Sequence, residues 1–153
     1  MQKMIQNFDI HFIHRLQKLE VPLARTAIFI VYFWFGLLKL IGVSPATPLV
    51  QALFKKTIVF IPFDTFYILF AIFEVVIGLL FLIHGFKRLG IFLLALHLIA
   101  TVLPLIFLPE LTWQAFLVPT LEGQYILKNI LIAASAVVVG ARLLPRPAEP
   151  NIN

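Results

Sequence analysis

One apolar stretch constrains the fold more than any other part of the chain. It covers residues 66–84 and carries a carboxylate, Glu74, near its middle. A charged side chain in the centre of a bilayer costs about 3 kcal/mol on insertion scales, so it persists by pairing, by facing a cavity or by losing its charge. Three other apolar stretches each contain a polar residue of their own. The sequence therefore predicts a small membrane bundle with a polar centre.

The composition agrees with a membrane environment. The chain is 61% hydrophobic and 12% charged, about half the charged fraction of an average soluble domain. It contains no cysteine, which excludes disulfides, thiolate metal sites and thioether-linked haem. The net charge is +5, but the basic residues flank apolar spans. Membrane topology accounts for them better than nucleic-acid binding, which we do not expect.

The fold class expected is all-α: an integral membrane four-helix bundle with amphipathic interfacial helices. Residues 1–24 have apolar side chains at helical spacing and predict an interfacial helix that Pro22 ends. Residues 25–143 contain the bundle, and the proline-rich residues 144–153 are expected to be disordered. The spans are expected at 25–42, 66–84, 89–108 and 121–142.

The connections carry helix signals and anchors of their own. Ser44 and Pro45 have the pattern of an N-cap and a first-turn proline, and predict a second interfacial helix. Pro104 should kink the third span and free carbonyl groups that Thr101 or water would satisfy. In the long connection 109–123, Trp113 is typical of an interfacial anchor.

The distribution of basic residues predicts the orientation. The rule that cytoplasmic loops carry most Lys and Arg places both termini in the cytoplasm. Only Lys55 and Lys56 clearly lie in loops on the other side. The residues on the terminal side are Lys3, Arg15, Lys18, Arg25, Lys87, Arg88, Arg142 and Arg146.

Helix rise converts sequence position into depth. Glu74 and His97 should lie about 15 Å and about 13 Å from the cytoplasmic ends of their spans, in one middle layer. Lys39 and Lys128 should lie about 21 Å deep, together with Asn129. A lysine stem covers the ~5 Å between these layers. We therefore expect Glu74 to reach at least one lysine.

Two lysines near one carboxylate leave two alternatives. Two buried ammonium groups repel each other strongly unless an anion lies between them. Either Lys39 and Lys128 extend outward to water, or the outer half of the bundle binds an anionic or acceptor-rich ligand. A purely structural pair between Glu74 and Lys39 is a third interpretation, and His97 is equally consistent with a hydrogen-bonding core residue.

Three stretches resemble one known family. They are YFWFGLLKLIGVSPATP at 32–48, FEVVIGLLFL around Glu74, and PTLEGQYILKN at 119–129. Together they resemble the DoxX-like family of small four-helix membrane proteins, and this resemblance implies a bundle in the cytoplasmic (inner) membrane. The founding members are similar to subunits of a thiosulfate:quinone oxidoreductase, and other relatives are linked to oxidant resistance or, in eukaryotes, to chaperone and cargo-receptor roles. The positions that carry the resemblance are Gly36, Lys39, Glu74, Gly78, Lys128 and Asn129.

The main functional hypothesis is a redox-associated subunit that binds a quinone or a small oxyanion in the outer half of the bundle. Glu74 and His97 would be catalytic and move protons, and no metal site is expected. The ligand-binding residues would be Lys39, Lys128, Asn129, Tyr32 and Tyr67. A redox role without cysteine needs a bound cofactor or substrate, or a partner redox subunit. The alternatives are a non-enzymatic accessory or assembly protein, and a small-anion transporter acting as a homodimer.

Overall fold

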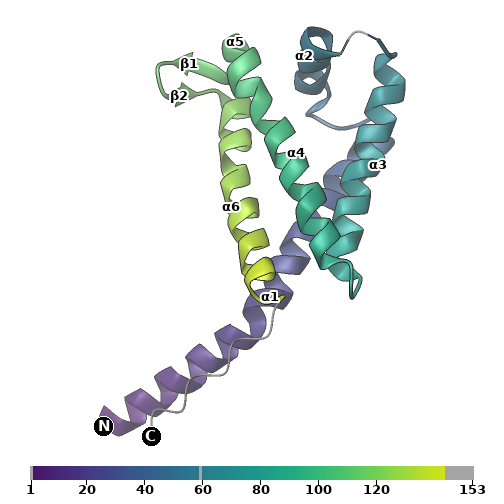
Figure 1. The fold of residues 1–153 in the computed structure, drawn as a ribbon. Coiled ribbons are helices and arrows are strands. Elements are labelled where there is room, and N and C mark those ends of the chain that lie inside the picture. Colours follow the sequence, from purple (N-terminus) through teal and green to yellow (C-terminus); the bar gives the residue numbers. More distant parts are fainter. Residues whose placement is uncertain (1, 59, 144–153) are drawn as a thin grey trace, which may run out of the picture.

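The computed structural model describes residues 2–58 and 60–143, and for residues 2–8 it describes the backbone only. The described residues form six α-helices and one β-hairpin (Figure 1). The expected all-α fold class is confirmed. The elements are α1 (Gln2–Leu40), α2 (Thr47–Thr57), α3 (Phe63–Leu82), α4 (Lys87–Phe107), α5 (Pro109–Thr112), β1 (Trp113–Ala115), β2 (Val118–Pro119) and α6 (Leu121–Ala141).

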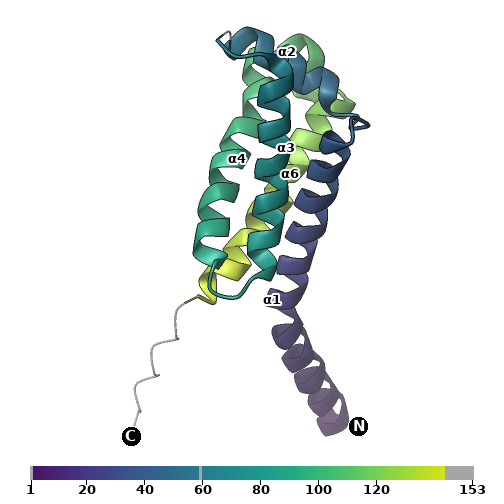
Figure 2. The same ribbon diagram turned by 90° about the vertical axis from the view of Figure 1, so that its right-hand side faces the viewer.

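Four of these helices are long and apolar enough to cross a membrane: α1 over Asp9–Leu40, and α3, α4 and α6 over their whole lengths. The chain is therefore a multi-pass membrane protein. We call one end of the bundle the α2 end, because α2, α5 and the hairpin lie there (Figures 1 and 2). The α3–α4 turn and the C-terminus of α6 lie at the opposite end.

The first helix differs from the expectation. Pro22 was expected to end an interfacial helix, but α1 runs unbroken through it. A proline removes one helical hydrogen bond and crowds the preceding turn, and membrane-spanning helices tolerate this because neighbouring groups satisfy the backbone. The N-terminal part of α1 extends beyond the bundle (Figures 1 and 2). A surface position for residues 1–24 stays a prediction, and residues 144–153 lie outside the described part of the chain.

The helix α2 begins later than expected. Ala46 is its N-cap residue and a proline follows in its first turn. Ser44 accepts a hydrogen bond from the Ala46 backbone N–H at 3.3 Å, so Ser44 and Pro45 form a turn before the helix. The ring of Phe54 on the buried side of α2 packs on Phe63 and Phe66 of α3.

A second contact attaches α2 to the junction between α4 and α5. The Lys56 ammonium donates to the carbonyl of Phe107 at 2.8 Å and to the Glu110 carboxylate at 3.0 Å. The pKa of the Glu110 carboxyl lies below its usual range, because a backbone N–H at Glu110 and the Lys56 side chain both hydrogen-bond to the carboxylate. Glu110 is therefore ionised at neutral pH, and α2 is held at α3 and at the α4–α5 junction.

The expectation for Thr101 is wrong. Its hydroxyl donates to the carbonyl of Leu98 at 2.9 Å. The carbonyl that Pro104 deprives of its helical partner belongs to Ala100, four residues earlier. The helix α4 continues through Pro104 to Phe107.

The connection 109–123 holds a hairpin that the sequence did not indicate. Trp113 pairs with Pro119 and Ala115 with Val118, so two residues form the loop. Leu117 in that loop has a φ of 57°, a left-handed conformation that Gly or Asn normally supplies. The missing turn residues explain why the hairpin was not predicted.

The helices α1 and α3 approach each other closely at two glycines. A Cβ on Gly78 would lie 2.9 Å from the backbone nitrogen of Phe33, and one on Gly36 would lie 3.0 Å from the carbonyl oxygen of Ala71. Both glycines are buried. Small residues let membrane helices approach closely, and here the backbones themselves meet.

Substituting Gly78 tests this contact. Gly78→Ala should lower the free energy of unfolding by about 1–3 kcal/mol, because the added carbon meets backbone that can move only by separating α1 from α3. Gly140→Ala is the matched control, since its Cβ would lie 3.5 Å from the Ile91 side chain, an ordinary contact. Thermal unfolding in detergent micelles measures both. Equal melting temperatures for the two variants would contradict the close approach.

Candidate functional site

Four polar side chains from three helices meet in the bundle interior. Tyr32 and Lys39 come from α1, Glu74 from α3 and His97 from α4; we call them the tetrad. They are only 5%, 6%, 5% and 5% exposed, respectively. The predicted shared layer of Glu74 and His97, with Lys39 reaching down to it, is confirmed.

The tetrad is a continuous chain of hydrogen bonds. Lys39 Nζ lies 2.6 Å from Glu74 Oε2. His97 Nε2 lies 3.1 Å from Glu74 Oε1, and the Tyr32 hydroxyl lies 2.9 Å from His97 Nδ1. Each oxygen of the carboxylate therefore has its own partner, on a different helix.

The chemistry of these groups fixes the direction of the bonds. An ionised carboxylate only accepts hydrogen bonds, so His97 Nε2 carries a proton and donates it to Glu74. His97 Nδ1 then accepts from the Tyr32 hydroxyl when the imidazole is neutral. If Nδ1 gains a proton, the hydroxyl can rotate and accept instead, because a phenol does both. The chain can hold one more proton without losing a hydrogen bond.

Aromatic rings enclose this chain. The Phe70 ring stacks on the His97 imidazole with centroids 5.2 Å apart and planes 17° apart. The Lys39 ammonium lies 5.7 Å from the same Phe70 centroid, and the Phe73 ring lies 6.1 Å from the imidazole. Charges in such a setting interact far more strongly than in water. Phe70 was not among the predicted site residues, although its position one turn before Glu74 is a usable signal.

Contacts at the opposite end of the bundle support the depth estimate. Arg25 of α1 donates to the carbonyls of Phe81 and Leu82 at 2.6 Å and 2.7 Å, so the start of the first span and the end of α3 lie at one level.

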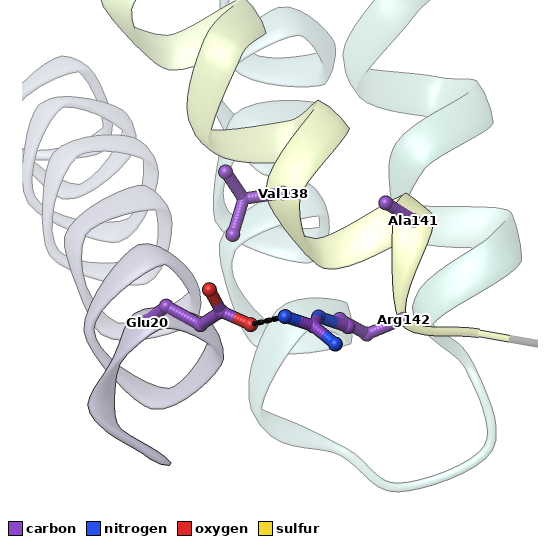
Figure 3. A pocket seen from close by; sticks show the side chains of 4 residues that line it. All are labelled: Glu20, Val138, Ala141 and Arg142. Carbon is purple, nitrogen blue, oxygen red and sulfur yellow. Dashed lines mark ion pairs between the residues drawn. The ribbon is translucent and has the colours of Figure 1, made fainter. Parts of the chain in front are cut away.

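Glu20 and Arg142 form an ion pair at the same end of the bundle (Figure 3). The pair lines a surface hollow of about 370 Å³ and links α1 to the C-terminus of α6. Both side chains are about one-third exposed, so this hollow is separate from the buried tetrad.

Lys128 does not join the tetrad. It is exposed, and its ammonium lies 5.1 Å from the centroid of the Tyr125 ring on the same helix. Lys128 lies in the second turn of α6, so its stem can extend to the headgroup region. Lys128 therefore extends outward, as the first alternative expected for both lysines, whereas Lys39 turns inward and pairs with Glu74.

Two other predicted ligand-binding residues lie in separate polar pairs toward the α2 end. The Tyr67 hydroxyl is hydrogen-bonded to the Thr47 hydroxyl at 2.5 Å and attaches the start of α2 to α3. The Asn129 amide donates to the Thr101 hydroxyl at 3.3 Å and joins α6 to α4. Tyr32, another predicted ligand-binding residue, lies at one end of the tetrad, where its hydroxyl contacts His97.

Comparison with known proteins adds no further constraint: no protein family, no curated protein and no solved structure matches this chain. The chemistry of the site therefore has to be inferred from its geometry. That geometry gives a net-neutral, aromatic-lined centre that contains a carboxylate, an ammonium, an imidazole and a phenol.

The tetrad predicts a specific pattern of stability changes. Glu74→Gln should cost about 3–5 kcal/mol of unfolding free energy, because it leaves the Lys39 ammonium buried without a counter-charge. The double variant with Lys39→Met should recover part of that loss, since no isolated charge remains. Lys128→Met, an exposed lysine, should change stability by about 0.5 kcal/mol or less.

Equilibrium unfolding in mixed micelles measures all four proteins. A Glu74→Gln variant as stable as the Lys128→Met variant would show that the carboxylate and Lys39 are not paired in the interior.

Proposed function

We propose that this chain is a redox-associated, DoxX-like subunit of the cytoplasmic membrane that binds a quinone and exchanges a proton with it through the tetrad. The observation that carries the proposal is the continuous hydrogen-bonded chain from Tyr32 to Lys39 in the bundle interior. Buried clusters of ionisable groups in membrane proteins commonly mark proton or substrate pathways.

The residues present fit a quinone carbonyl better than an oxyanion. Two lysines in the interior would favour an anion, but Lys128 lies outside the tetrad. Lys39 is already neutralised by Glu74, so an added anion would meet no excess positive charge. A lysine ammonium has three N–H groups, and Lys39 uses one of them on Glu74. Another can donate to a neutral carbonyl oxygen.

The other tetrad residues would handle the proton. His97 can gain a proton at Nδ1 while Tyr32 changes from donor to acceptor, and Glu74 stabilises the resulting imidazolium through Oε1. Proton gain gives the buried tetrad a net positive charge, which low dielectric disfavours. The tetrad would therefore hold the proton only briefly and return it. A bound quinone would supply the electron chemistry, and a partner subunit would exchange the electrons.

The resemblance to the DoxX-like family supports this proposal by analogy, because founding members are similar to subunits of a quinone oxidoreductase. Analogy at the level of a fold is weaker support than the geometry of a site. The proposed orientation, with both termini in the cytoplasm, would place the α2 end on the outer side. Quinone would then reach Lys39 from the outer half of the bundle.

A second function is favoured by one specific observation. Among the described residues, every buried side-chain nitrogen and oxygen has at least one hydrogen-bond partner, so each polar atom of the tetrad is already paired within the protein. A self-satisfied network suits a non-enzymatic accessory protein in which the tetrad fixes the register of α1, α3 and α4. In that case, a folded Lys39→Met/Glu74→Gln double variant would still act as the accessory protein in the membrane.

Quinone binding by the purified protein in lipid nanodiscs separates the two functions. A short-chain ubiquinone analogue should bind the wild type, and Lys39→Met should weaken binding at least tenfold, or about 1.4 kcal/mol. Lys128→Met should bind like the wild type, because that lysine lies outside the tetrad.

Tyr32→Phe is the informative third variant. It removes the group that alternates between donor and acceptor but leaves Lys39 in place, so binding should persist while quinone-dependent oxidation in membranes falls. Absence of quinone binding by the wild type, or unchanged binding by folded Lys39→Met, would contradict the proposal.

A further inference from the structure

The hairpin loop carries Phe116, the most exposed large apolar side chain among the described residues, and two further exposed apolar side chains beside it. Phe116 is 91% exposed, Leu117 72% and Val118 48%. Residues 113–119 contain no charged side chain. Leu117 holds a left-handed backbone conformation that a side chain of its kind rarely adopts, so the loop presents a large apolar group where Gly or Asn would be less strained.

The hairpin also has a defined place and direction. It projects sideways from the bundle at the α2 end, next to the start of α6 (Figure 1). At its base, the Trp113 indole N–H donates to the carbonyl of Leu105 at 3.0 Å, which fixes the strand to α4. The Thr120 hydroxyl donates to the carbonyl of Leu111 at 2.7 Å. The apolar loop is thus held away from the bundle axis by both strands.

The exposed side chains of α6, the helix that follows the hairpin, identify the environment. On α6, Ile130 is 72% and Leu131 67% exposed, which is typical of a face in contact with lipid chains. Tyr125 and Lys128 are exposed on the first two turns of the same helix, and such residues gather at the headgroup level of a membrane. The hairpin comes immediately before these turns, so it lies beside the headgroups.

We infer that residues 116–118 insert into the lipid leaflet at the α2 end and anchor the hairpin there. The occupant of the apolar surface is lipid, because residues 113–119 carry no charge and lead directly into α6, whose exposed apolar side chains suit lipid chains. Aromatic and aliphatic side chains beside a polar backbone suit the boundary between headgroups and acyl chains. The inference does not depend on the proposed function, since it concerns a surface separate from the tetrad.

Spin labelling tests this inference, and the absence of cysteine allows single labels without background. Phe116→Cys and Val118→Cys would each carry a nitroxide in vesicles of phosphatidylethanolamine and phosphatidylglycerol. Lys55→Cys, on the exposed side of α2, is the aqueous control, and Ile130→Cys is the lipid control. Collision rates with oxygen, which partitions into lipid, are compared with those of a water-soluble nickel chelate.

We expect the labels at 116 and 118 to collide often with oxygen and rarely with the nickel chelate, as the label at 130 does. A nickel-dominated response like that at 55 would overturn the inference, because the loop would be in water. Low collision rates with both reagents would also overturn it, because a protein surface, either a second copy or a partner, would then cover the loop. Two positions keep the test valid if one label disturbs the hairpin.

Discussion

The Glu74 carboxylate sets the condition that the rest of the bundle has to meet. An ionised carboxylate at bilayer depth requires donors for both oxygens, and the described structure supplies one from α1 and one from α4. Because each donor comes from a different helix, satisfying one side chain fixes the axial register of three spans. Removing a single partner would leave a buried charge, which is far more costly than never having had the pair. The polar centre therefore fixes the axial register of α1, α3 and α4, independently of any other function.

Helix packing and the polar centre depend on each other. The short Lys39–Glu74 distance requires α1 and α3 to approach closely, and Gly36 and Gly78 permit this because a Cβ at either position would press on the facing backbone. The centre is closed on one side by the stacked ring of Phe70. The same closeness gives the tetrad its chemical character, since low dielectric strengthens every charge interaction within it. If His97 gains a proton inside the tetrad, the free energy of that protonation depends strongly on any change of charge nearby.

Much of the fold was predictable because the length of a membrane span and the rise per residue of a helix vary little. Depth arithmetic placed Glu74, His97 and Lys39 correctly, since helix geometry leaves little freedom in axial position. Lys128 had the same computed depth as Lys39 but extends outward, because a flexible four-carbon stem near a helix end takes the direction of better hydration. The hydrogen bond from Tyr32 to His97 depends on side-chain rotation about two helices, which spacing does not specify. The hairpin was not predicted because its loop lacks the Gly or Asn that marks such turns. Pro22 was misread as the end of a helix because a membrane-spanning helix can continue through a proline.

The central claim is that Lys39, Glu74, His97 and Tyr32 form one buried hydrogen-bonded network. Solid-state NMR of the isotopically labelled protein in lipid bilayers tests it most directly, through dipolar couplings between Glu74 Cδ and the side-chain nitrogens of Lys39 and His97. We predict a strong coupling to Lys39 Nζ, a weaker one to His97 Nε2, and a proton on His97 Nε2. Absence of coupling to Lys39 Nζ, or a His97 proton on Nδ1 alone, would contradict it.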